Sequence, residues 1–544
     1  MNSSRQDMTQ APDLRERGTG PVRHRRPNYF DILPPCNVAC PAGEDIQGWL
    51  ALAEKGEFEQ AWQSLIENNP LPATMGRICY HPCESKCNRG QLDSSVSIHA
   101  VERFLGDMAR ENNWQPKFDA KPSGKRVLVV GAGPSGLSTA YHLARLGHEV
   151  EIYEAGPVAG GMMHFGIPAY RLPRDVLADE IGRIKDMGVK LKLNHKVTDL
   201  IKEKEDGNFD AVFVAVGAHL SKKIDIPARD AGKIYDALSF LKDVEMGNKP
   251  KLGRRVAIYG GGNTAMDAAR VAKRLGIDDA LIVYRRDREH MPAHEFEADE
   301  AIEEDVKIHW LRTIKEIKED KMTVEVMRIN DKGRPEPTGE FETLAADSLI
   351  LALGQDVDTE FLRKVPGIEI EWDGVVKVSD NMMTGYTGVF AGGDMVPSDR
   401  TATIAVGHGK KAARNIDAWL RNTEYTKPAK KPVADLEKLN LWYYTDSAHR
   451  PQPQLSKERR VDSFDEVIGG LNQDEAKFEA KRCLSCGNCF ECDGCYGACP
   501  EDAIIKLGKG KRYRYDYDLC TGCAVCFEQC PCHAIEMIPE PEQD

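Results

Sequence analysis

Near the carboxyl end, cysteines recur at two- and three-residue intervals in two runs, each closed by a proline. Both runs fit C-x2-C-x2-C-x3-C-P, the first at Cys489, Cys492, Cys495 and Cys499 and the second at Cys520, Cys523, Cys526 and Cys530. At this spacing three thiolates of one run hold one iron–sulfur cubane, and the fourth reaches the cubane of the other run. The sequence therefore predicts one [4Fe–4S] cluster on Cys489, Cys492, Cys495 and Cys530 and a second on Cys520, Cys523, Cys526 and Cys499.

Zinc is the alternative metal for such cysteine pairs. Two copies that each end in Cys-Pro are a pattern of bacterial ferredoxins and not of zinc ribbons, so we favour the clusters. Three further cysteines of this region, Cys483, Cys486 and Cys532, are surplus to the two motifs. We expect Cys532 to be an ordinary buried thiol.

All sixteen cysteines lie toward the two ends of the chain, five between Cys36 and Cys87 and eleven between Cys483 and Cys532. Their crowding is too tight for most disulfides and suits metal ions, which also indicates a reducing, cytoplasmic compartment. We therefore expect one or more clusters at the N-terminus as well. The five cysteines there are Cys36, Cys40, Cys79, Cys83 and Cys87.

The segment from Lys125 reads as strand, glycine turn and helix. Gly131, Gly133 and Gly136 form G-x-G-x-x-G directly after the apolar strand VLVV. The glycines allow a tight turn and the close approach of a pyrophosphate to the helix N-terminus. Glu154 ends the next strand, where a carboxylate can bind a ribose diol. The combination predicts a dinucleotide site and not a merely structural glycine turn.

A second unit of the same kind begins at Arg254, with G-x-G-x-x-A after the strand VAIY. Where the first unit has its acid, this one has Arg285 and Arg286. A carboxylate there would repel a 2′-phosphate, whereas arginines bind one in a fork, so we expect NADPH in preference to NADH. The alternative is that one or both arginines simply face solvent. The expected NADP contacts are Gly260, Gly262, Asn263, Thr264, Ala265, Arg285 and Arg286.

A third element lies between residues 388 and 416, where a strand ends at Gly393-Asp394 and a helix containing Ala405 follows. It resembles the second FAD motif of flavoproteins with two dinucleotide domains, whose aspartate binds near the ribityl phosphate. The resemblance implies a discontinuous FAD domain with the NADP domain inserted in it. Many such flavoproteins reduce disulfides with a cysteine pair beside the flavin, but no cysteine occurs between Cys87 and Cys483, which excludes that chemistry here.

These segments predict a multidomain α/β protein with a helical iron–sulfur domain, two Rossmann-like domains and a bacterial-type ferredoxin domain. Within the helical domain, apolar residues over 44–70 recur at helical spacing on both sides of Lys55-Gly56, which predicts a helical hairpin. The expected boundaries are 1–35 for a flexible tail, 36–120 for the iron–sulfur domain, 121–235 with 346–425 for the FAD domain, 236–345 for the NADP domain, 426–476 for a linker and 477–544 for the ferredoxin domain.

The 544 residues, 41% of them hydrophobic, suffice for three or four domains with cores of their own. The net charge of −13 argues against nucleic acid as a partner. No apolar run reaches the length of a membrane span. The polar, Arg-rich first residues lack the apolar region of a secretory signal, so we expect none.

The motifs follow one another in a recognisable order: RICYHPCESKC (77–87), VSIHAVERF (96–104), GAGPSG (131–136), GGMMHFGIPAYRLP (160–173) and YRRDREHMPA (284–293). This order resembles the small subunit of NADPH-dependent glutamate synthase, over roughly residues 36–425. The electron-entry half of dihydropyrimidine dehydrogenase is similar too. The expected FAD contacts thereby become Gly131, Gly133, Gly136, Glu154, Gly161, Arg171, Gly393, Asp394 and Ala405.

That family opens with an EA-x-RCL-x-C motif, which is missing before Cys36 but occurs here as EAKRCLSC at 479–486. The resemblance suggests that Cys483 and Cys486 fold back and complete an N-terminal cluster. The alternative is a single N-terminal cluster with spare thiols, so that the chain holds three or four [4Fe–4S] clusters. If Cys483 and Cys486 do fold back, one N-terminal cluster would be held by Cys36, Cys87, Cys483 and Cys486. The other would be held by Cys40, Cys79 and Cys83, with Glu102 at the family's non-cysteine ligand position.

The resemblance implies hydride transfer from NADPH to FAD by positioning, without a catalytic acid or base, and then transfer of single electrons through clusters. With its appended ferredoxin domain the chain resembles an NAD(P)H:ferredoxin-type oxidoreductase subunit. Its acceptor would be a ferredoxin or a catalytic partner such as a 2-oxoacid:ferredoxin oxidoreductase, an aryl-CoA reductase, a sulfite reductase or a glutamate synthase-like subunit. The alternatives are an authentic glutamate synthase small subunit, for which the ferredoxin domain is unexpected, and a non-catalytic redox-sensing protein.

Overall fold

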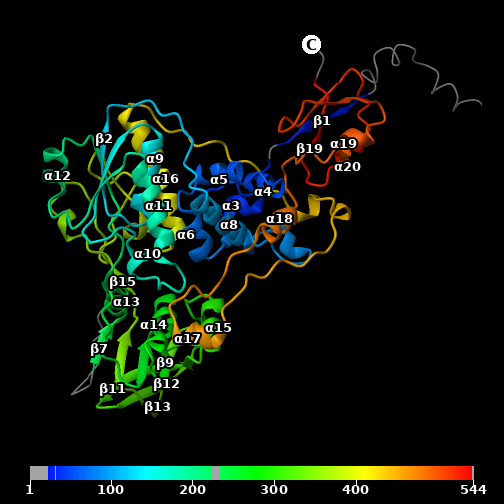
Figure 1. The fold of residues 1–544 in the computed structure, drawn as a ribbon. Coiled ribbons are helices and arrows are strands. Elements are labelled where there is room, and N and C mark those ends of the chain that lie inside the picture. Colours follow the sequence, from blue (N-terminus) through cyan, green and yellow to red (C-terminus); the bar gives the residue numbers. More distant parts are fainter. Residues whose placement is uncertain (1–22, 31, 223–232, 542–544) are drawn as a thin grey trace, which may run out of the picture.

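The computed structural model of the chain describes residues 23–30, 32–222 and 233–541. Figure 1 shows a small C-terminal domain at one end of the molecule, a group of helices at its centre and two sheet-containing domains beyond them. The multidomain α/β class predicted from the sequence is confirmed. Among the described residues, no helix combines the length and the apolar character needed to cross a membrane.

The central helices belong to the N-terminal domain. Its predicted hairpin consists of α4 (Ile46–Glu54) and α5 (Phe58–Ile66), and the turn between them uses Gly56 at a positive φ of 76°. Trp49 and Trp62 are fully buried between these helices and the rest of the domain. The other helices are α3 (Pro35–Ala39), α6 (Pro72–Ile78), α7 (Pro82–Ser85), the 3-10 turn η1 (Asn88–Gln91) and α8 (Ile98–Glu111).

A five-stranded parallel sheet forms the first dinucleotide domain, in the order β16-β5-β2-β3-β4. Strand β16 (Val389–Ala391) pairs with β5 (Ala211–Val214) although the chain between them builds another sheet. This is the discontinuous domain that the sequence predicted, and it shares one apolar core with the N-terminal helices. Its remaining elements are β2 (Arg126–Val130), β3 (Glu149–Tyr153), β4 (Lys190–Lys192), α9 (Pro134–Arg145), α10 (Met162–Phe165), α11 (Arg174–Asp186), α12 (Leu200–Asp206), η2 (Glu360–Leu362), η3 (Gly393–Met395) and α16 (Ala402–Leu420).

The inserted domain has a second parallel sheet in the order β10-β9-β8-β14-β7. Both β7 (Lys233–Asp236) and β14 (Ser348–Leu351) belong to it, so the domain is wider at both ends than the predicted 236–345. The short pair β6 (Leu220–Ser221) and β15 (Gln355–Asp356) crosses between the two domains. The other elements are α13 (Ala237–Glu245), β8 (Arg255–Tyr259), α14 (Asn263–Arg274), β9 (Asp279–Tyr284), α15 (Glu295–Glu303), β10 (Lys307–Trp310), β11 (Arg312–Lys318), β12 (Lys321–Ile329) and β13 (Pro335–Ala345).

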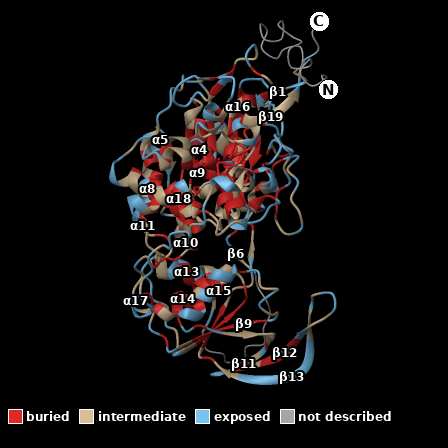
Figure 2. Cartoon of the chain, turned by 90° about the vertical axis from the view of Figure 1, so that its right-hand side faces the viewer, coloured by how far each residue is buried: buried red, intermediate tan, exposed pale blue. Residues whose placement is uncertain are grey.

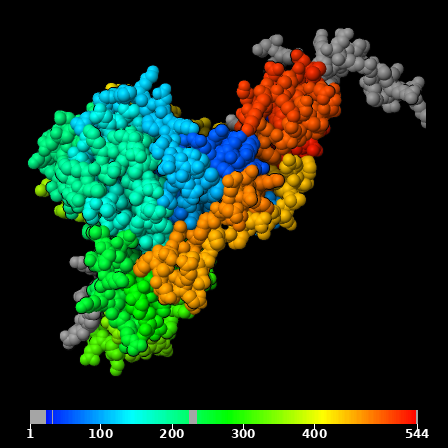
Figure 3. All heavy atoms as spheres, viewed as in Figure 1, coloured from blue at the N-terminus to red at the C-terminus, as the bar shows by residue number. Residues whose placement is uncertain are grey.

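The expected linker over 426–476 is largely packed structure. Residues 453–469, which we call the strap, form a small hairpin closed by hydrogen bonds from Leu455 N to Val467 O (2.9 Å) and from Gly469 N to Pro453 O (2.7 Å). The strap carries α17 (Lys457–Asp462), which packs on α14, and Val467 is buried in the core of the inserted domain. Figure 3 shows the orange part of the chain on the surface between the blue helices and the green inserted domain.

The C-terminal domain includes a strand from the opposite end of the chain. Strand β1 (Arg25–Tyr29) pairs antiparallel with β19 (Ile535–Pro539). Of the predicted flexible tail over 1–35, residues 1–22 lie outside the described residues, whereas this strand is an integral part of the ferredoxin domain. The remaining C-terminal elements are η4 (Leu436–Lys438), η5 (Leu441–Tyr443), α18 (Gln473–Lys481), α19 (Gly494–Ala498), β17 (Ile504–Lys506), β18 (Tyr513–Tyr515) and α20 (Val525–Glu528).

Burial is unevenly distributed over these parts. Figure 2 shows the buried residues gathered in the helices and first sheet, with a thinner buried layer through the inserted domain and an exposed strand β13 at its end. Small separate cores hold the ferredoxin domain and its junction, where Ile32, Ala434 and Leu484 pack together. The ferredoxin domain therefore depends on contacts from both ends of the chain.

Candidate functional site

Two cavities in the C-terminal domain collect the cysteines in the sets that the sequence predicted. We call them the first and the second ferredoxin site. Each is lined by four cysteines of the two motifs. In each cavity the fourth cysteine comes from the other motif, as the pattern requires. The first site contains Cys489, Cys492, Cys495 and Cys530, and the second contains Cys499, Cys520, Cys523 and Cys526.

The N-terminal strand closes both cavities. Pro27 lines the second ferredoxin site and Tyr29 the first, and the ring of Tyr29 lies 5.4 Å from that of Tyr515. Arg23 donates to the carbonyl oxygen of Cys520 at 2.9 Å. Sequence reasoning missed these residues because a five-residue strand beginning RRP has no alternating apolar pattern.

Cys532 lies in the wall of the first ferredoxin site, with its Sγ 3.8 Å from that of Cys530. The pKa of Cys530 is lowered to about 7, mainly by its hydrogen bond with Cys532. At 2% exposure Cys532 is buried, as expected of an ordinary core thiol. Burial followed by the neighbouring thiol of Cys489 raises the pKa of Cys495 to about 12.

A third cavity, the helical-domain site, lies between α3, α6, α7 and α8. It is lined by Cys40, Cys79, Cys83 and Glu102, the set that the resemblance implied. Glu44 also faces it and was not foreseen. Burial, followed by repulsion from Glu44, raises the pKa of Glu102 well above its usual range.

The four remaining N-terminal and surplus cysteines form a fourth group, the shared site, consisting of Cys36, Cys87, Cys483 and Cys486. The pKa of Cys36 is raised well above its usual range, first by burial and then by the thiols of Cys483, Cys87 and Cys486. The capping box of α18, formed by Asn472 and Glu475, begins the helix that delivers Cys483. The fold-back predicted for EAKRCLSC is therefore present in the structure.

The chemistry of these four groups fits iron–sulfur clusters. The cysteines are all free thiols, every one except Cys523 is buried or partly buried, and burial is the main reason why the pKa values of Cys36 and Cys495 are raised. Burial without positive charge disfavours the thiolate, which a bound metal would restore. Three groups offer four thiols and the helical-domain site offers three thiols and a carboxyl group.

The first glycine turn has the geometry of a pyrophosphate cradle. A Cβ on Gly136 would collide with the carbonyl oxygen of Gly131, whereas the space next to Gly133 is open. Glu154 accepts hydrogen bonds from Ala132 N and Gly156 N, both at 2.7 Å. These bonds fix the carboxylate at the end of β3 beside the glycine turn.

Elements distant in sequence complete this cradle. Gly161 packs on Gly133, and Gly393 lies next to Ser135 and Ala405. The hydroxyl of Ser135 is buried without a hydrogen-bond partner, and burial raises the pKa of Asp394 to about 6. An unpaired hydroxyl and a neighbouring buried acid around open space fit a polar ligand such as FAD.

Arg171 forms ion pairs that the sequence did not reveal. It is paired with Asp267 Oδ2 at 2.8 Å and with Glu297 Oε1 at 2.5 Å, both in the inserted domain. The guanidinium bridges the two dinucleotide domains through these acids, and its contact with FAD stays a prediction. The motif around it suggested a cofactor contact because sequence alone does not show that two acids approach from another domain.

The second glycine turn repeats the cradle at the start of α14. A Cβ on Gly260 would collide with Ala352 O, while nothing lies near Gly262, and Ala265 is buried in the helix. Arg285 is exposed, and the buried Nε of Arg286 has no hydrogen-bond partner. Both arginines thus fit a 2′-phosphate, and Thr264 lies on the first turn of α14.

The side chain of Asn263 is engaged on both sides. Its Nδ2 donates to Tyr80 Oη at 2.6 Å and its Oδ1 accepts from His294 N at 3.1 Å. That Asn263 contacts the nucleotide stays a prediction. The observed partners instead connect the helical domain with the inserted domain.

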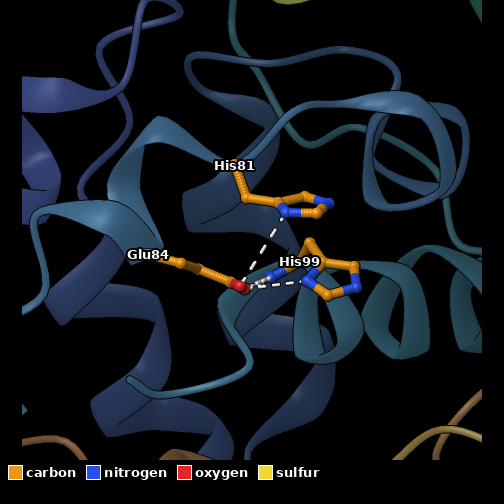
Figure 4. A group of neighbouring side chains, drawn as sticks. All are labelled: His81, Glu84 and His99. Atoms are coloured by element: carbon orange, nitrogen blue, oxygen red, sulfur yellow. Dashed lines mark hydrogen bonds and ion pairs between the residues drawn. The ribbon is translucent and has the colours of Figure 1, made fainter. Parts of the chain in front are cut away.

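Sequence reasoning also missed a group formed by His81, Glu84 and His99, whose ligand atoms lie within 4.8 Å of one another. Figure 4 shows the Glu84 carboxylate beside the two rings, with dashed lines that join it to each of them. Both nitrogens of His99 are bonded, to Glu84 Oε1 and to Gln452 Oε1, each at 2.8 Å. The rings stack at 3.9 Å, so their lone pairs do not converge on one ion. We interpret the group as a hydrogen-bond network.

Comparisons with known proteins agree with this arrangement. Residues 125–409 match the model of the pyridine nucleotide-disulphide oxidoreductase family, residues 32–114 that of dihydropyrimidine dehydrogenase domain II with its 4Fe-4S cluster, and residues 513–536 that of the 4Fe-4S binding domain. A β subunit of NADP(+)-dependent formate dehydrogenase from Moorella thermoacetica is 36% identical over 84% of this chain and 71% of its own.

Two further relatives are similar. The β subunit of the NADPH-Fe(3+) oxidoreductase of Geobacter sulfurreducens is 34% identical over 83% of this chain and 75% of its own. The small chain of the NADPH glutamate synthase of Escherichia coli is 32% identical over 71% of this chain and 89% of its own. The resemblance drawn from the motifs is thereby confirmed.

Proposed function

Because the chain belongs to the pyridine nucleotide-disulphide oxidoreductase family, we propose that it is an electron-transfer subunit that moves electrons between NADPH and a protein acceptor through FAD and [4Fe–4S] clusters. The observation that carries the proposal is the convergence of four cysteine-containing groups in one chain with two glycine cradles. Bound FAD can take a hydride from NADPH and release its electrons singly, which is the form that clusters accept.

The residues of the first cradle would bind and orient FAD. The N-terminal amides of α9 and the open space at Gly133 would receive the pyrophosphate, and Glu154 would bind the ribose diol. Gly161, Gly393, Asp394 and Ala405 complete the cradle on its other sides. Their work is positioning, since hydride transfer requires no acid or base from the protein.

The second cradle would bind NADPH. The free amides at the start of α14 face the space next to Gly262, where a pyrophosphate fits. The unpartnered Nε of Arg286 and the exposed Arg285 would hold the 2′-phosphate. This assignment supports NADPH over NADH.

The four cysteine-containing groups would hold the clusters. Cys486 and Cys489 are separated by only two residues, so the shared site and the first ferredoxin site adjoin along the chain. The two ferredoxin sites exchange their fourth ligands and are therefore also neighbours. Cys523, the exposed cysteine of the second ferredoxin site, marks the outer end of this series and the place where a partner would take electrons.

An authentic glutamate synthase small subunit is the first alternative. The E. coli small chain aligns with 71% of this chain while using 89% of its own length, so most of the remainder has no counterpart in it. The ferredoxin domain therefore favours another partner, either a ferredoxin or a catalytic subunit such as a 2-oxoacid oxidoreductase, an aryl-CoA reductase or a sulfite reductase. The formate dehydrogenase and Fe(3+) oxidoreductase relatives are named as subunits, which supports a partner-bound role.

The test uses the full chain purified without oxygen. We expect about sixteen irons and as many sulfides per FAD, corresponding to four cubanes. Anaerobic NADPH is expected to bleach the flavin and then to produce the signals of reduced clusters in electron paramagnetic resonance. A flavin that NADPH leaves oxidised would overturn the proposal and favour the non-catalytic alternative.

A further inference from the structure

The side chain of Tyr80, the residue after Cys79, extends from the iron–sulfur domain and contacts the inserted domain. Tyr80 stacks on His294 with ring centroids 3.7 Å apart and planes within 19° of parallel. Its hydroxyl oxygen accepts the 2.6 Å hydrogen bond from Asn263 Nδ2. Asn263 is the first residue of α14, next to the space that the glycine turn leaves open.

The contact with His294 anchors a loop, residues 285–294, that begins with the two arginines. Tyr284 Oη donates to His290 O at 3.0 Å, and Ala293 N donates to Gly261 O at 3.1 Å. His294 N is bonded in turn to Asn263 Oδ1. The loop is thus folded back onto the glycine turn, and Tyr80 stacks on its last residue.

Other contacts also hold the inserted domain in its orientation relative to the FAD domain and the helical domain. Arg171 joins the FAD domain to α14 and α15 through Asp267 and Glu297. The strap's Glu466 pairs with Arg77 (2.7 Å) and Arg103 (3.0 Å) of the helical domain. These contacts position the inserted domain, so that Asn263 and His294 lie within reach of Tyr80.

We propose that Tyr80 is a positioning residue for the nucleotide, holding Asn263 and the loop 285–294 in the conformation that recognises the 2′-phosphate of NADP(H). The proposal rests on the assignment of the second cradle to NADPH. Tyr80 acts through His294 and Asn263 and need not touch the nucleotide itself. The iron–sulfur domain would then contribute to coenzyme selection in a neighbouring domain.

The proposal has a specific consequence for coenzyme preference. NADH lacks the phosphate that Arg285 and Arg286 would bind, so loosening their loop costs NADPH more than NADH. Tyr80→Phe removes one hydrogen bond and keeps the stacking, which predicts a loss of about fivefold in NADPH affinity. Tyr80→Ala removes both contacts and should lower the NADPH preference further.

The experiment compares the holoenzyme with Tyr80→Phe, Tyr80→Ala and His294→Ala. Equilibrium titration with NADP+ and with NAD+ gives the two affinities without turnover, and the KM and kcat for NADPH and NADH follow. Tyr235→Phe is the matched control, because the hydroxyl of Tyr235 donates to Lys251 O at 3.2 Å elsewhere in the inserted domain. Iron and FAD contents show whether each variant is intact.

Support consists of weaker NADP+ binding and a higher KM for NADPH, with NADH nearly unchanged, and of non-additive effects when Tyr80→Ala and His294→Ala are combined. Equal losses for both coenzymes, or none in variants with full iron and FAD, would overturn the role of Tyr80. If NADPH fails to reduce even the wild-type flavin, the proposed function falls. The NADP+ titration of the variants still decides the role of Tyr80 in that case.

Discussion

Asn69 donates a hydrogen bond of 2.7 Å from its side-chain amide to Glu102 Oε1, and both side chains are buried. The same amide donates to Glu44 Oε1 at 3.1 Å, so one asparagine orients two carboxyl groups at the helical-domain site. Trp49 Nε1 donates to Glu44 Oε2 at 3.3 Å, which occupies the second oxygen of Glu44. Glu102 is therefore the better candidate for a fourth ligand beside the three cysteines.

Replacement of Glu102 by Ala is expected to lower the iron content by about four atoms per chain, because a cubane with three thiolates and no fourth ligand is labile. Glu44→Gln is the matched control and should retain the iron, since Gln keeps the size of the side chain and its amide oxygen can still accept one of the two hydrogen bonds, from Asn69 or from Trp49. Iron and sulfide analysis of the two variants measures the difference. Equal iron in both would remove Glu102 from the ligand set.

The shared site predicts a second loss of iron. Cys483→Ser with Cys486→Ser should remove about four irons and leave the signals of the two ferredoxin sites in place. Cys532→Ser provides the control, because this thiol lies in the wall of a cavity that already has four cysteines. Unchanged iron in the double variant would mean that Cys483 and Cys486 are spare thiols.

Coenzyme preference depends on two arginines. Exchange of Arg285 and Arg286 for Ala should raise the KM for NADPH by about tenfold or more, since hydrogen bonds to a charged group contribute about 1.5–3 kcal/mol each. The KM for NADH should change little. Arg254→Ala is the control, an exposed arginine of the same domain paired with Asp278 at 2.5 Å. A KM for NADPH that stays at the wild-type value would refute the assignment.

The ferredoxin ligand sets and the glycine cradles could be predicted from the sequence because their chemistry fixes short spacings between residues, whereas the two N-terminal sets followed from the resemblance alone. Cys489 and its partners at two- and three-residue intervals are of this kind, as is the turn at Gly131. The strand at Arg25–Tyr29, the strap and the bridge from Arg171 to Asp267 depend on pairing between distant segments. No local period or propensity encodes such partners, so they became visible only in the folded chain.

A buried ionic group is expected to dominate the stability of the inserted domain. Glu304 is fully buried and is bonded by Arg274 at 2.6 and 2.9 Å and by Arg270 at 2.7 and 3.1 Å. Glu304→Gln leaves the buried guanidinium of Arg274 without its counter-ion and that of Arg270 with Glu300 alone. The expected loss is about 3–5 kcal/mol of unfolding free energy. It is measured by following the unfolding of the inserted domain in a denaturant titration.

The same group gives a pH dependence with a defined sign. Burial acts to raise the pKa of Glu304, but the hydrogen bonds from Arg274 and Arg270 outweigh it, so the pKa lies below the usual 4.5. Its stabilising contribution is therefore complete above about pH 4.5 and is lost as the pH falls through the lower, folded-state value. Glu304→Gln should flatten this part of the stability profile. If the stability of the variant still falls at low pH as it does in the wild type, other carboxyl groups cause this loss of stability.

The strap gives the last prediction. Glu466 joins Arg77 and Arg103 of the helical domain, and Arg460 of α17 reaches Glu303 of the inserted domain at 2.9 Å. Glu466→Gln removes the charge that two nearly buried arginines share, so the strap should open more often. We expect faster amide hydrogen exchange over residues 453–469 and weaker NADP+ binding, with unchanged iron at the ferredoxin sites. Arg459→Ala, which removes only an exposed 3.2 Å pair with Asp465, is the control. Exchange equal to that of the wild type would show that apolar contacts such as that of Val467 hold the strap without this ion pair.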